Sequence, residues 1–298
     1  IGAARSGTTL LGEQVLSCLH HIDYIGEPDY LWEYAKGYRT DDTLTSKDAS
    51  NKKAIKFRKK FDSFVKEKQT LILEKTPANC FRLPFINKIF PEAKYIHLIR
   101  DGRDVALSAS KEWAAIKSDA IDSQNIRKAS FIIKFIKTTL RESDVRNRFS
   151  SFKDIYFIPK YIIKFINYTS RQILKNDKLP WGPKFPGIKQ VRQRFSLLET
   201  CAIQWERSII AVESALEYID KEKVLRIYYE DLIENPFEEL RKILQFMNIS
   251  DKKETIENLA SIIISRNTYK WKTDLNKEEL QSINEQISFT LKSLGYKI

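Results

Sequence analysis

Short apolar runs alternate with longer helical patterns along most of this chain. The runs that predict buried strands are His21–Gly26, Thr70–Glu74, Lys94–Ile99 and Val224–Tyr229, and the chain opens inside a strand–loop–helix pattern. Helices are predicted at Leu10–Leu19, Ala54–Lys68, Ala78–Phe90, Arg103–Lys117, Ser196–Ile219 and Pro236–Met247. Strands that alternate with helices are typical of a parallel sheet covered on both faces. We therefore expect an α/β fold with a central parallel sheet of about five strands.

Residues 118–195 do not follow this alternation of strands and helices. They contain two basic, apolar helical patterns, Ile126–Leu140 and Pro159–Leu174, followed by a Pro- and Gly-rich turn at Pro180–Gly187. No internal repeat or low-complexity tract is present. We expect a single domain over residues 1–298, in which residues 118–195 form a helical insertion packed on the core.

Charge is distributed unevenly. The formal net charge is +12, and the stretch Arg127–Lys178 alone holds thirteen Lys or Arg and four Asp or Glu, a net of +9. A basic balance suits anionic ligands such as nucleotides, anionic glycans, nucleic acid or a membrane surface. The three cysteines, Cys18, Cys80 and Cys201, are far apart and odd in number, so neither a disulfide framework nor a metal site is expected.

A glycine loop, Gly2-Ala-Ala-Arg-Ser-Gly-Thr-Thr9, precedes the first predicted helix. Two glycines five residues apart let successive backbone N–H groups surround an anion, and the following helix adds its positive end. Thr8 stands where a nucleoside triphosphatase carries Lys, and the cation is instead Arg5. The loop therefore suits one phosphate-like group beside an arginine better than the β- and γ-phosphates of ATP with Mg²⁺. A simple turn leading into a helix is the alternative.

A second segment, Leu98-Ile-Arg-Asp-Gly-Arg-Asp-Val-Ala-Leu-Ser108, follows a predicted strand. It places Arg100 at the carboxyl end of that strand and Ser108 one to two turns into the next helix. Ligands of open α/β sheets bind at the carboxyl ends of strands. We expect Arg100 and Ser108 to bind a second anion beside the first. The alternative is a turn capped by Asp104, with Arg100 in a surface ion pair.

Together these segments resemble the sulfotransferases that use 3'-phosphoadenosine-5'-phosphosulfate (PAPS). Arg5-Ser-Gly-Thr-Thr9 is similar to the family's 5'-phosphosulfate loop, and Arg100 with Ser108 to its 3'-phosphate pair. Other similar segments are Glu74-Lys-Thr-Pro77 with Asn79, Phe90-Pro-Glu-Ala-Lys94, Tyr229-Glu-Asp-Leu232 and Trp271-Lys272. The resemblance covers about residues 1–113 and 196–298, and is closer to the tyrosylprotein, carbohydrate and bacterial branches than to the small-phenol cytosolic branch. It implies a P-loop NTPase-like central parallel sheet flanked by helices, PAPS as donor, 3'-phosphoadenosine-5'-phosphate (PAP) as product, and no metal.

Sulfuryl transfer needs cations for the leaving phosphate of the donor. The resemblance assigns donor binding to the loop residues Arg5, Ser6, Gly7, Thr8 and Thr9, with Arg5 also stabilising charge during catalysis. By resemblance to the tyrosylprotein branch, Lys75 contacts the transferring group as the second catalytic cation. Arg266 and Lys270, in the stretch Ser265–Lys272, are further candidates for the 3'-phosphate.

The acceptor hydroxyl needs a general base, for which Glu27 is the candidate. It follows a predicted strand and precedes Pro28, which fixes an extended turn, and related branches carry a Glu in this place. A surface Glu near a helix N-terminus is the alternative, and Asp29 is the second candidate. Structural roles are predicted for the remaining possibilities: His20 and His21 after the first helix, His97 buried within a strand, and Glu230 and Asp231 as helix caps.

Two other functions compete with this interpretation. A P-loop kinase or NTPase could use Asp101 as its metal-binding residue, but the missing Lys at position 8 counts against it. A non-enzymatic binder of nucleic acid or membrane could use residues 127–178. The apolar residues there recur at helical spacing, which favours buried helix faces, so no nucleic-acid partner is expected.

The acceptor stays open among carbohydrate, protein tyrosine, lipid and small metabolite. Residues 118–195 are expected to bind it, and their charge favours an anionic or membrane-proximal acceptor. The low cysteine count fits a cytoplasmic enzyme of the bacterial type, while a Golgi-lumen enzyme whose N-terminal anchor was removed would look the same.

Overall fold

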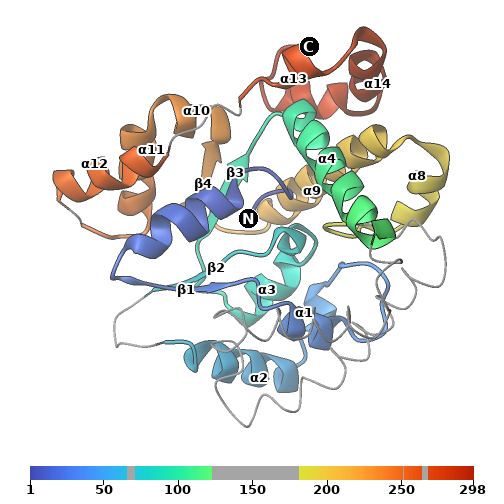
Figure 1. Cartoon of the computed structure of the whole chain (residues 1–298). Coiled ribbons are helices and arrows are strands. Elements are labelled where there is room, and N and C mark those ends of the chain that lie inside the picture. Colours follow the sequence, from blue (N-terminus) through green and yellow to red (C-terminus); the bar gives the residue numbers. More distant parts are fainter. Residues whose placement is uncertain (66–70, 123–180, 251, 264–267) are drawn as a thin grey trace.

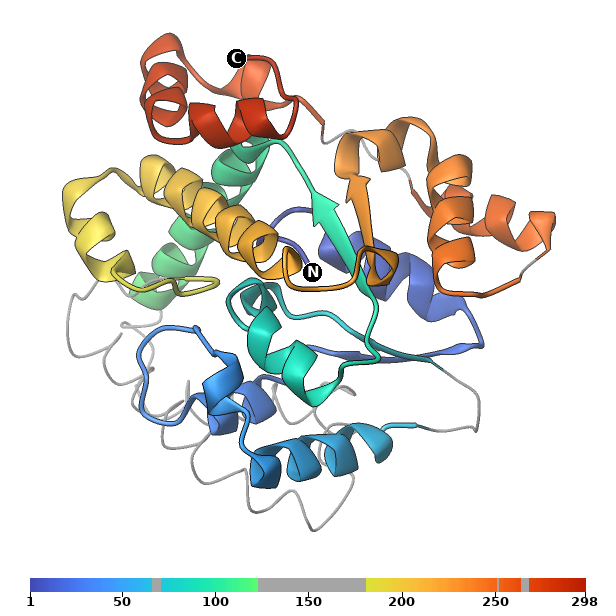
Figure 2. The same cartoon turned by 180° about the vertical axis from the view of Figure 1, so that it is seen from behind.

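The strands form two short parallel pairs. The computed structural model describes residues 1–65, 71–122, 181–250, 252–263 and 268–298, which fold as a mixed α/β protein rich in helices (Figures 1 and 2). Strand β1 (Ile22–Gly26) pairs with β2 (Leu71–Glu74), and β3 (Tyr95–Ile99) pairs with β4 (Val224–Tyr228). These four strands confirm the four predicted apolar runs to within one residue at each end.

The expectation of one central sheet of about five strands is wrong for the described residues, since their strands form two separate sheets. Ile1 lies beside β3, where its amino group donates a hydrogen bond to the carbonyl of Ile96 (2.7 Å) and its carbonyl accepts one from the N–H of Leu98 (2.9 Å). Figures 1 and 2 both show the N-terminal end between the two strand pairs.

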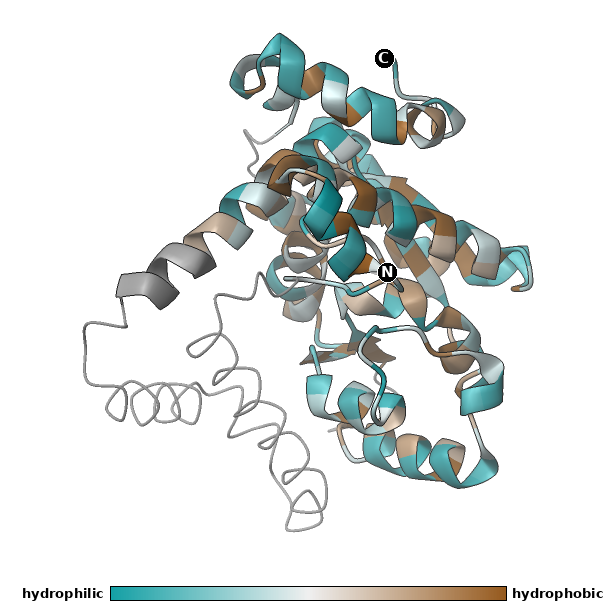
Figure 3. Cartoon of the chain, turned by 90° about the vertical axis from the view of Figure 1, so that its right-hand side faces the viewer, coloured by the Kyte–Doolittle hydropathy of each residue, from teal (hydrophilic) through white to brown (hydrophobic). Residues whose placement is uncertain are grey.

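Helices surround both pairs. They are α1 (Asp29–Lys36), α2 (Asn51–Asp62), α3 (Leu83–Ile89), α4 (Gly102–Asp122), α8 (Ile188–Arg194), α9 (Leu197–Leu216), α10 (Tyr229–Glu234), α11 (Pro236–Phe246), α12 (Lys253–Ile262), α13 (Trp271–Asp274) and α14 (Lys277–Ser293). Figure 3 shows hydrophobic and hydrophilic residues interspersed along them, as amphipathic helices require. Within the described residues, none combines the length and apolarity needed to cross a bilayer.

Three predicted helices differ from those observed. The first is a π-helix at Leu10–Val15 continued by a 3₁₀ turn at Leu16–Cys18. Helix α2 begins earlier than expected because the side chain of Ser50 caps it, accepting a hydrogen bond from the N–H of Lys53 (3.4 Å). The helix expected at Ala78–Phe90 is divided into a 3₁₀ turn and α3, since Arg82 between them has a non-helical φ of −125°.

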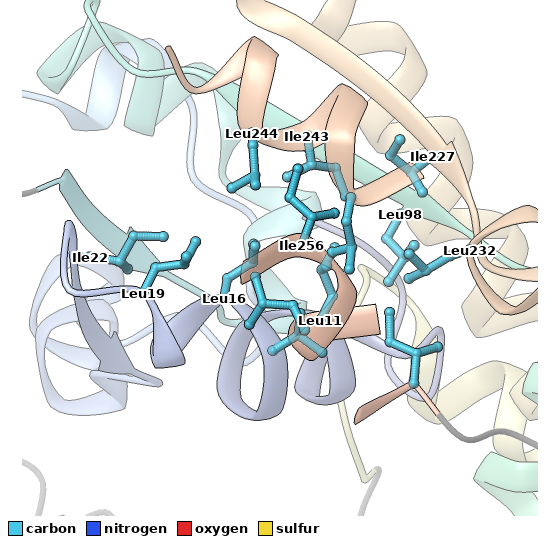
Figure 4. Close-up of a cluster of buried hydrophobic side chains, with 14 of the residues drawn as sticks. Leu11, Leu16, Leu19, Ile22, Leu98, Ile227, Leu232, Ile243, Leu244 and Ile256 are labelled. Carbon is cyan, nitrogen blue, oxygen red and sulfur yellow. The ribbon is translucent and has the colours of Figure 1, made fainter. Parts of the chain in front are cut away.

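Two apolar clusters hold the region of the glycine loop in place. The π-helix packs Leu11, Val15 and Leu16 against residues of β3, β4 and α10–α12, as Figure 4 shows for Leu98, Ile227 and Ile243. On the other side, α4 packs against α9 and α14. The indole of Trp205 in α9 lies so close to Gly102 that a Cβ there would come within 2.5 Å of its ring. Only glycine therefore lets α4 begin this near α9.

Candidate functional site

The loop of residues 2–9 adopts a constrained turn. Arg5 has a φ of +68°, unusual for a residue with a side chain, and Gly7 has a φ of +93°. A Cβ on Gly7 would lie 2.5 Å from the ring of Tyr229, so the loop closes tightly on α10. The side chain of Ser6 is buried, whereas Thr8 and Thr9 begin the following helical turn. Such strain is commonly found at ligand sites.

The loop and α4 bring Arg5, Arg100 and Ser108 together. Arg100 donates a hydrogen bond from its guanidinium to the Arg5 carbonyl (3.0 Å), and Nε of Arg5 donates one to Oγ of Ser108 (3.0 Å). The Arg100 guanidinium also lies 4.4 Å from the centre of the Tyr229 ring. Arg5 makes a loose, exposed ion pair with Glu112 (3.6 Å). These contacts place two cations and a hydroxyl on one short stretch of surface.

The ends of β1 and β2 bring Glu27 and Lys75 together. The two strands run parallel with Gly26 opposite Glu74, so the residues that follow them are neighbours. Lys75, itself buried, contacts the Glu27 carboxylate in an ion pair and donates a hydrogen bond to Oγ1 of Thr9 (3.2 Å). Lys75 thus connects the proposed base to the glycine loop.

Glu74 stabilises the end of β2. Its carboxylate accepts hydrogen bonds from the indole of Trp32 (3.2 Å), the hydroxyl of Thr76 (2.5 Å) and the amide of Asn79 (2.6 Å). Burial raises the pKa of Glu74 to about 7, although these hydrogen bonds oppose the shift. The strand end that presents Lys75 is therefore held by a dense polar network.

Both clusters open into one cleft of about 1060 Å³. The loop contributes Arg5, Gly7, Thr8 and Thr9 to its lining. What we call the α4 wall consists of Arg100, Asp104, Leu107, Ser108, Lys111, Glu112 and Ala115 of α4 and its entrance, with Lys270. The facing α1 wall consists of Glu27, Asp29, Glu33, Asp42, Thr76, Pro77, Ala78, Arg82 and Trp181–Lys184. Figure 1 shows α4, which follows β3, in the upper half of the molecule and α1, which follows β1, in the lower half.

Asp42 is the centre of the α1 wall. Its Oδ1 accepts hydrogen bonds from Nζ of Lys36 (2.8 Å) and from the guanidinium of Arg82 (2.9 Å), and its Oδ2 accepts one from the N–H of Lys184 (2.7 Å). Burial raises the pKa of Asp42, but the charges of Arg82 and Lys36 outweigh it and hold that pKa below its ordinary value. One carboxylate therefore joins α1, the start of α3 and the segment after residue 180.

The Trp181–Gly187 turn is rigidly attached to α9. The side-chain amide of Gln204 donates hydrogen bonds to the carbonyls of Trp181 and Pro183, both at 2.8 Å. Burial lowers the pKa of Lys184, which lies on this turn and lines the cleft. The predicted turn is confirmed, with left-handed backbone at Gly182 and Gly187.

Asp104 joins α4 to the segment 268–274. Its carboxylate accepts hydrogen bonds from the N–H groups of Tyr269 (2.7 Å) and Trp271 (2.9 Å), and lies 3.7 Å from the Arg100 guanidinium. Burial raises the pKa of Asp104, although these neighbours oppose the shift. The cap at the start of α4 comes from Asp101, which accepts a hydrogen bond from the N–H of Arg103 (2.9 Å), so the alternative of Asp104 as the cap is wrong.

The other candidates divide between the cleft and the interior. Lys270 lines the cleft, and Arg266 lies outside the described residues.

His97 is buried within β3, as predicted; it contacts Glu213 (3.1 Å), and burial lowers its pKa. Glu230 is structural but is not a cap of its own helix, because it accepts hydrogen bonds from the N–H of Asp101 and the hydroxyl of Tyr296. His20 and His21 contact each other, with ring centres 3.6 Å apart.

Sequence reasoning missed Asp42, Lys36, Arg82 and Gln204. They lie in segments without a recognisable motif, and only the fold brings Asp42 and Arg82 to the α1 wall and Lys36 and Gln204 behind it. The only feature of the sequence that pointed to Lys184 was its place in a Pro- and Gly-rich turn. Within the described part of the chain, no three His, Cys, Asp or Glu side chains meet as a metal site would require.

Comparison with known proteins is consistent with this site. A family model described as the sulfotransferase family matches residues 1–141 and 174–253. The match includes the glycine loop, both strand pairs and all of α4. No curated protein matches the chain. Because the family model covers most of its length, the chain belongs to the sulfotransferase family.

Proposed function

We propose that the protein transfers the sulfuryl group of PAPS to a hydroxyl group of an acceptor. The observation that carries the proposal is the position of Lys75, which contacts both Thr9 of the glycine loop and the Glu27 carboxylate. A cation between an anion-binding loop and a carboxylate is what transfer from a bound anionic donor to a hydroxyl requires.

The donor would bind along the loop and the α4 wall. Arg5 with the hydroxyls of Thr8 and Thr9 would hold the 5'-phosphosulfate, and Arg100 with Ser108 the 3'-phosphate. The contact between Arg5 and Ser108 (3.0 Å) supports this arrangement, because it brings the two anion sites next to each other as one nucleotide would need. The left-handed backbone at Arg5 and Gly7 makes the loop a tight turn, and the ring of Tyr229 leaves no room for a side chain at position 7. Arg5 and Arg100 would balance the negative charge of the donor, so donor binding would not require Mg²⁺.

The chemistry would take place between Thr9 and Glu27. PAPS supplies an activated sulfuryl group, and the protein positions it and provides the base. The acceptor oxygen bonds to sulfur, its proton passes to Glu27, and the bond from sulfur to the 5'-phosphate oxygen breaks. Arg5 and Lys75 stabilise the charge that develops on the transferring group and on the departing phosphate.

The acceptor would enter along the α1 wall and the insertion. The described end of the insertion, Trp181–Lys184, lines the cleft, which supports a role for residues 118–195 in acceptor binding. An anionic or membrane-proximal acceptor remains the proposal for the basic stretch 127–178, which lies entirely outside the described residues.

Nucleotide binding tests this function against the kinase alternative. Calorimetric titration in EDTA should show PAP binding, and ATP with Mg²⁺ should bind at least about tenfold more weakly, because Thr8 replaces the Lys that holds β- and γ-phosphates. Tighter binding of ATP with Mg²⁺, together with no binding of PAP, would overturn the proposal.

A further inference from the structure

The segment 268–274 lies against the α4 wall through several independent contacts. Besides the two hydrogen bonds to Asp104, the ring of Trp271 lies 3.8 Å from the Arg103 guanidinium, and Asp274 forms an ion pair with Lys111 (2.8 Å). The segment is therefore fixed to the helix that carries Ser108.

Lys270 sits between the two residues that Asp104 holds. Tyr269 and Trp271 flank it, and both donate their N–H groups to the same carboxylate. Tyr269 has a φ of +58°, a conformation that costs free energy for a residue with a side chain. A buried carboxylate that accepts two N–H groups can hold such a backbone, because these charge-assisted bonds are about twice as strong as neutral ones. Lys270 itself lines the cleft.

The same carboxylate also faces Arg100, at 3.7 Å. Asp104 is almost completely buried, with 2% of its surface exposed, so its orientation is set by these partners rather than by solvent. It is not needed as a helix cap, since Asp101 has that role. One side chain thus orients both Arg100 and the backbone on either side of Lys270.

We propose that Asp104 is a positioning residue of the donor site, which fixes Lys270 opposite Arg100 so that both cations reach the 3'-phosphate of the nucleotide. This inference rests on the proposed function. Asp104 would thereby make the protein prefer nucleotides with a 3'-phosphate over those without one, although a carboxylate by itself repels phosphate. The net effect is favourable because Asp104 directs two cations toward one anion.

The test compares PAP with 5'-AMP, which lacks the 3'-phosphate. In the wild type, PAP should bind far more tightly than AMP. Asp104→Asn replaces an acceptor oxygen by an N–H₂ group and removes the charge, so PAP affinity should fall about ten- to a hundredfold while AMP affinity changes by less than about threefold. A general structural role would instead weaken both nucleotides equally, and that result, or an unchanged ratio, would overturn the inference. Asp220→Asn, which removes an exposed carboxylate paired with Lys223 outside the cleft lining, is the control and should keep the ratio.

A measurement on the wild type keeps the inference testable if Asp104→Asn does not fold. PAP should slow hydrogen exchange at the amides of Tyr269 and Trp271, and AMP should not. Equal protection by both nucleotides, or by neither, would contradict the role of Asp104. If instead the wild type shows no preference for PAP over AMP, the proposed PAPS site itself fails, which is a different result from a preference that Asp104→Asn leaves intact.

Discussion

The two walls of the cleft differ in charge. The loop and the α4 wall present four cations, Arg5, Arg100, Lys111 and Lys270, against two carboxylates, Asp104 and Glu112. The α1 wall presents four carboxylates, Glu27, Asp29, Glu33 and Asp42, against Arg82 and Lys184. The loop and the α4 wall therefore attract a multiply anionic donor, which orients it before any specific contact forms.

The walls also differ in how their charges are supported. On the α1 wall, Lys36 and Lys75 lie behind the lining and pair with Asp42 and Glu27, so charge is balanced inside the protein. On the α4 wall, the ion pairs of Arg5 and Lys111 are exposed and easily exchanged for a ligand. This difference supports the proposal that the α4 wall binds the anionic donor, while internal ion pairs stabilise the α1 wall.

The largest expected effect concerns the α1 wall. Asp42→Asn would leave Arg82 buried without the carboxylate it contacts and Lys36 with Glu33 as its remaining partner, at a cost of about 3 kcal/mol in the free energy of unfolding, measured by chemical denaturation. Asp220→Asn, in an exposed pair with Lys223, is the control and should cost less than about 0.5 kcal/mol. If Asp42→Asn cost as little as the control, Asp42 would not be a residue that stabilises the α1 wall.

The same carboxylate predicts a pH dependence. Because the pKa of Asp42 is lower in the folded protein than in the unfolded chain, its contribution is complete above about pH 4 and is lost as the pH falls through the folded value. The Asp42→Asn protein should lose less stability than the wild type over that acid range.

The next effect concerns the base. Glu27→Gln should lower turnover about a hundredfold or more, since an amide cannot take the proton of the acceptor, while PAP affinity stays nearly unchanged. Asp29→Asn, on the same wall, should retain most of the turnover. Glu27 would not be the base if Glu27→Gln kept wild-type turnover. Loss of turnover in Asp29→Asn, or in substitutions of His20 or His21, would then identify the base.

A smaller effect is expected on the α4 wall. Arg100→Ala should weaken PAP binding by about one to two orders of magnitude, as loss of a charge-assisted pair does, and should leave AMP binding nearly unchanged. Arg241→Ala removes an exposed arginine paired with Glu238 and serves as the control. Calorimetry that gives equal affinities for PAP and AMP in the wild type would contradict the assignment of Arg100.

The smallest effect is expected from the insertion. Charge reversal at Lys134, Lys137, Lys160 and Lys164 should raise the KM for an anionic acceptor several-fold and reduce its dependence on salt, with donor affinity kept. Unchanged acceptor kinetics would mean that the basic stretch is ordinary surface and that the acceptor is recognised near Glu27 alone.

The two walls also differ in how well the sequence predicts them. Arg5, Arg100 and Ser108 belong to continuous motifs at strand ends, so their convergence follows from the rule that parallel strands present their carboxyl ends together. The α1 wall depends on contacts such as Asp42 with Lys184, which are far apart in the chain and have no local signature. The four strands could be predicted from apolar runs, but their division into two pairs could not, because pairing depends on tertiary contacts.

Sulfuryl transfer is tested most directly by following labelled sulfate from PAPS with the purified protein in EDTA, over a panel of carbohydrate, tyrosyl-peptide, lipid and small-metabolite hydroxyls. We expect label on at least one hydroxyl class, with formation of PAP in equal amount, and loss of both in Glu27→Gln. If no acceptor is labelled while the protein hydrolyses or transfers phosphate from ATP, the protein is not a sulfotransferase of this kind.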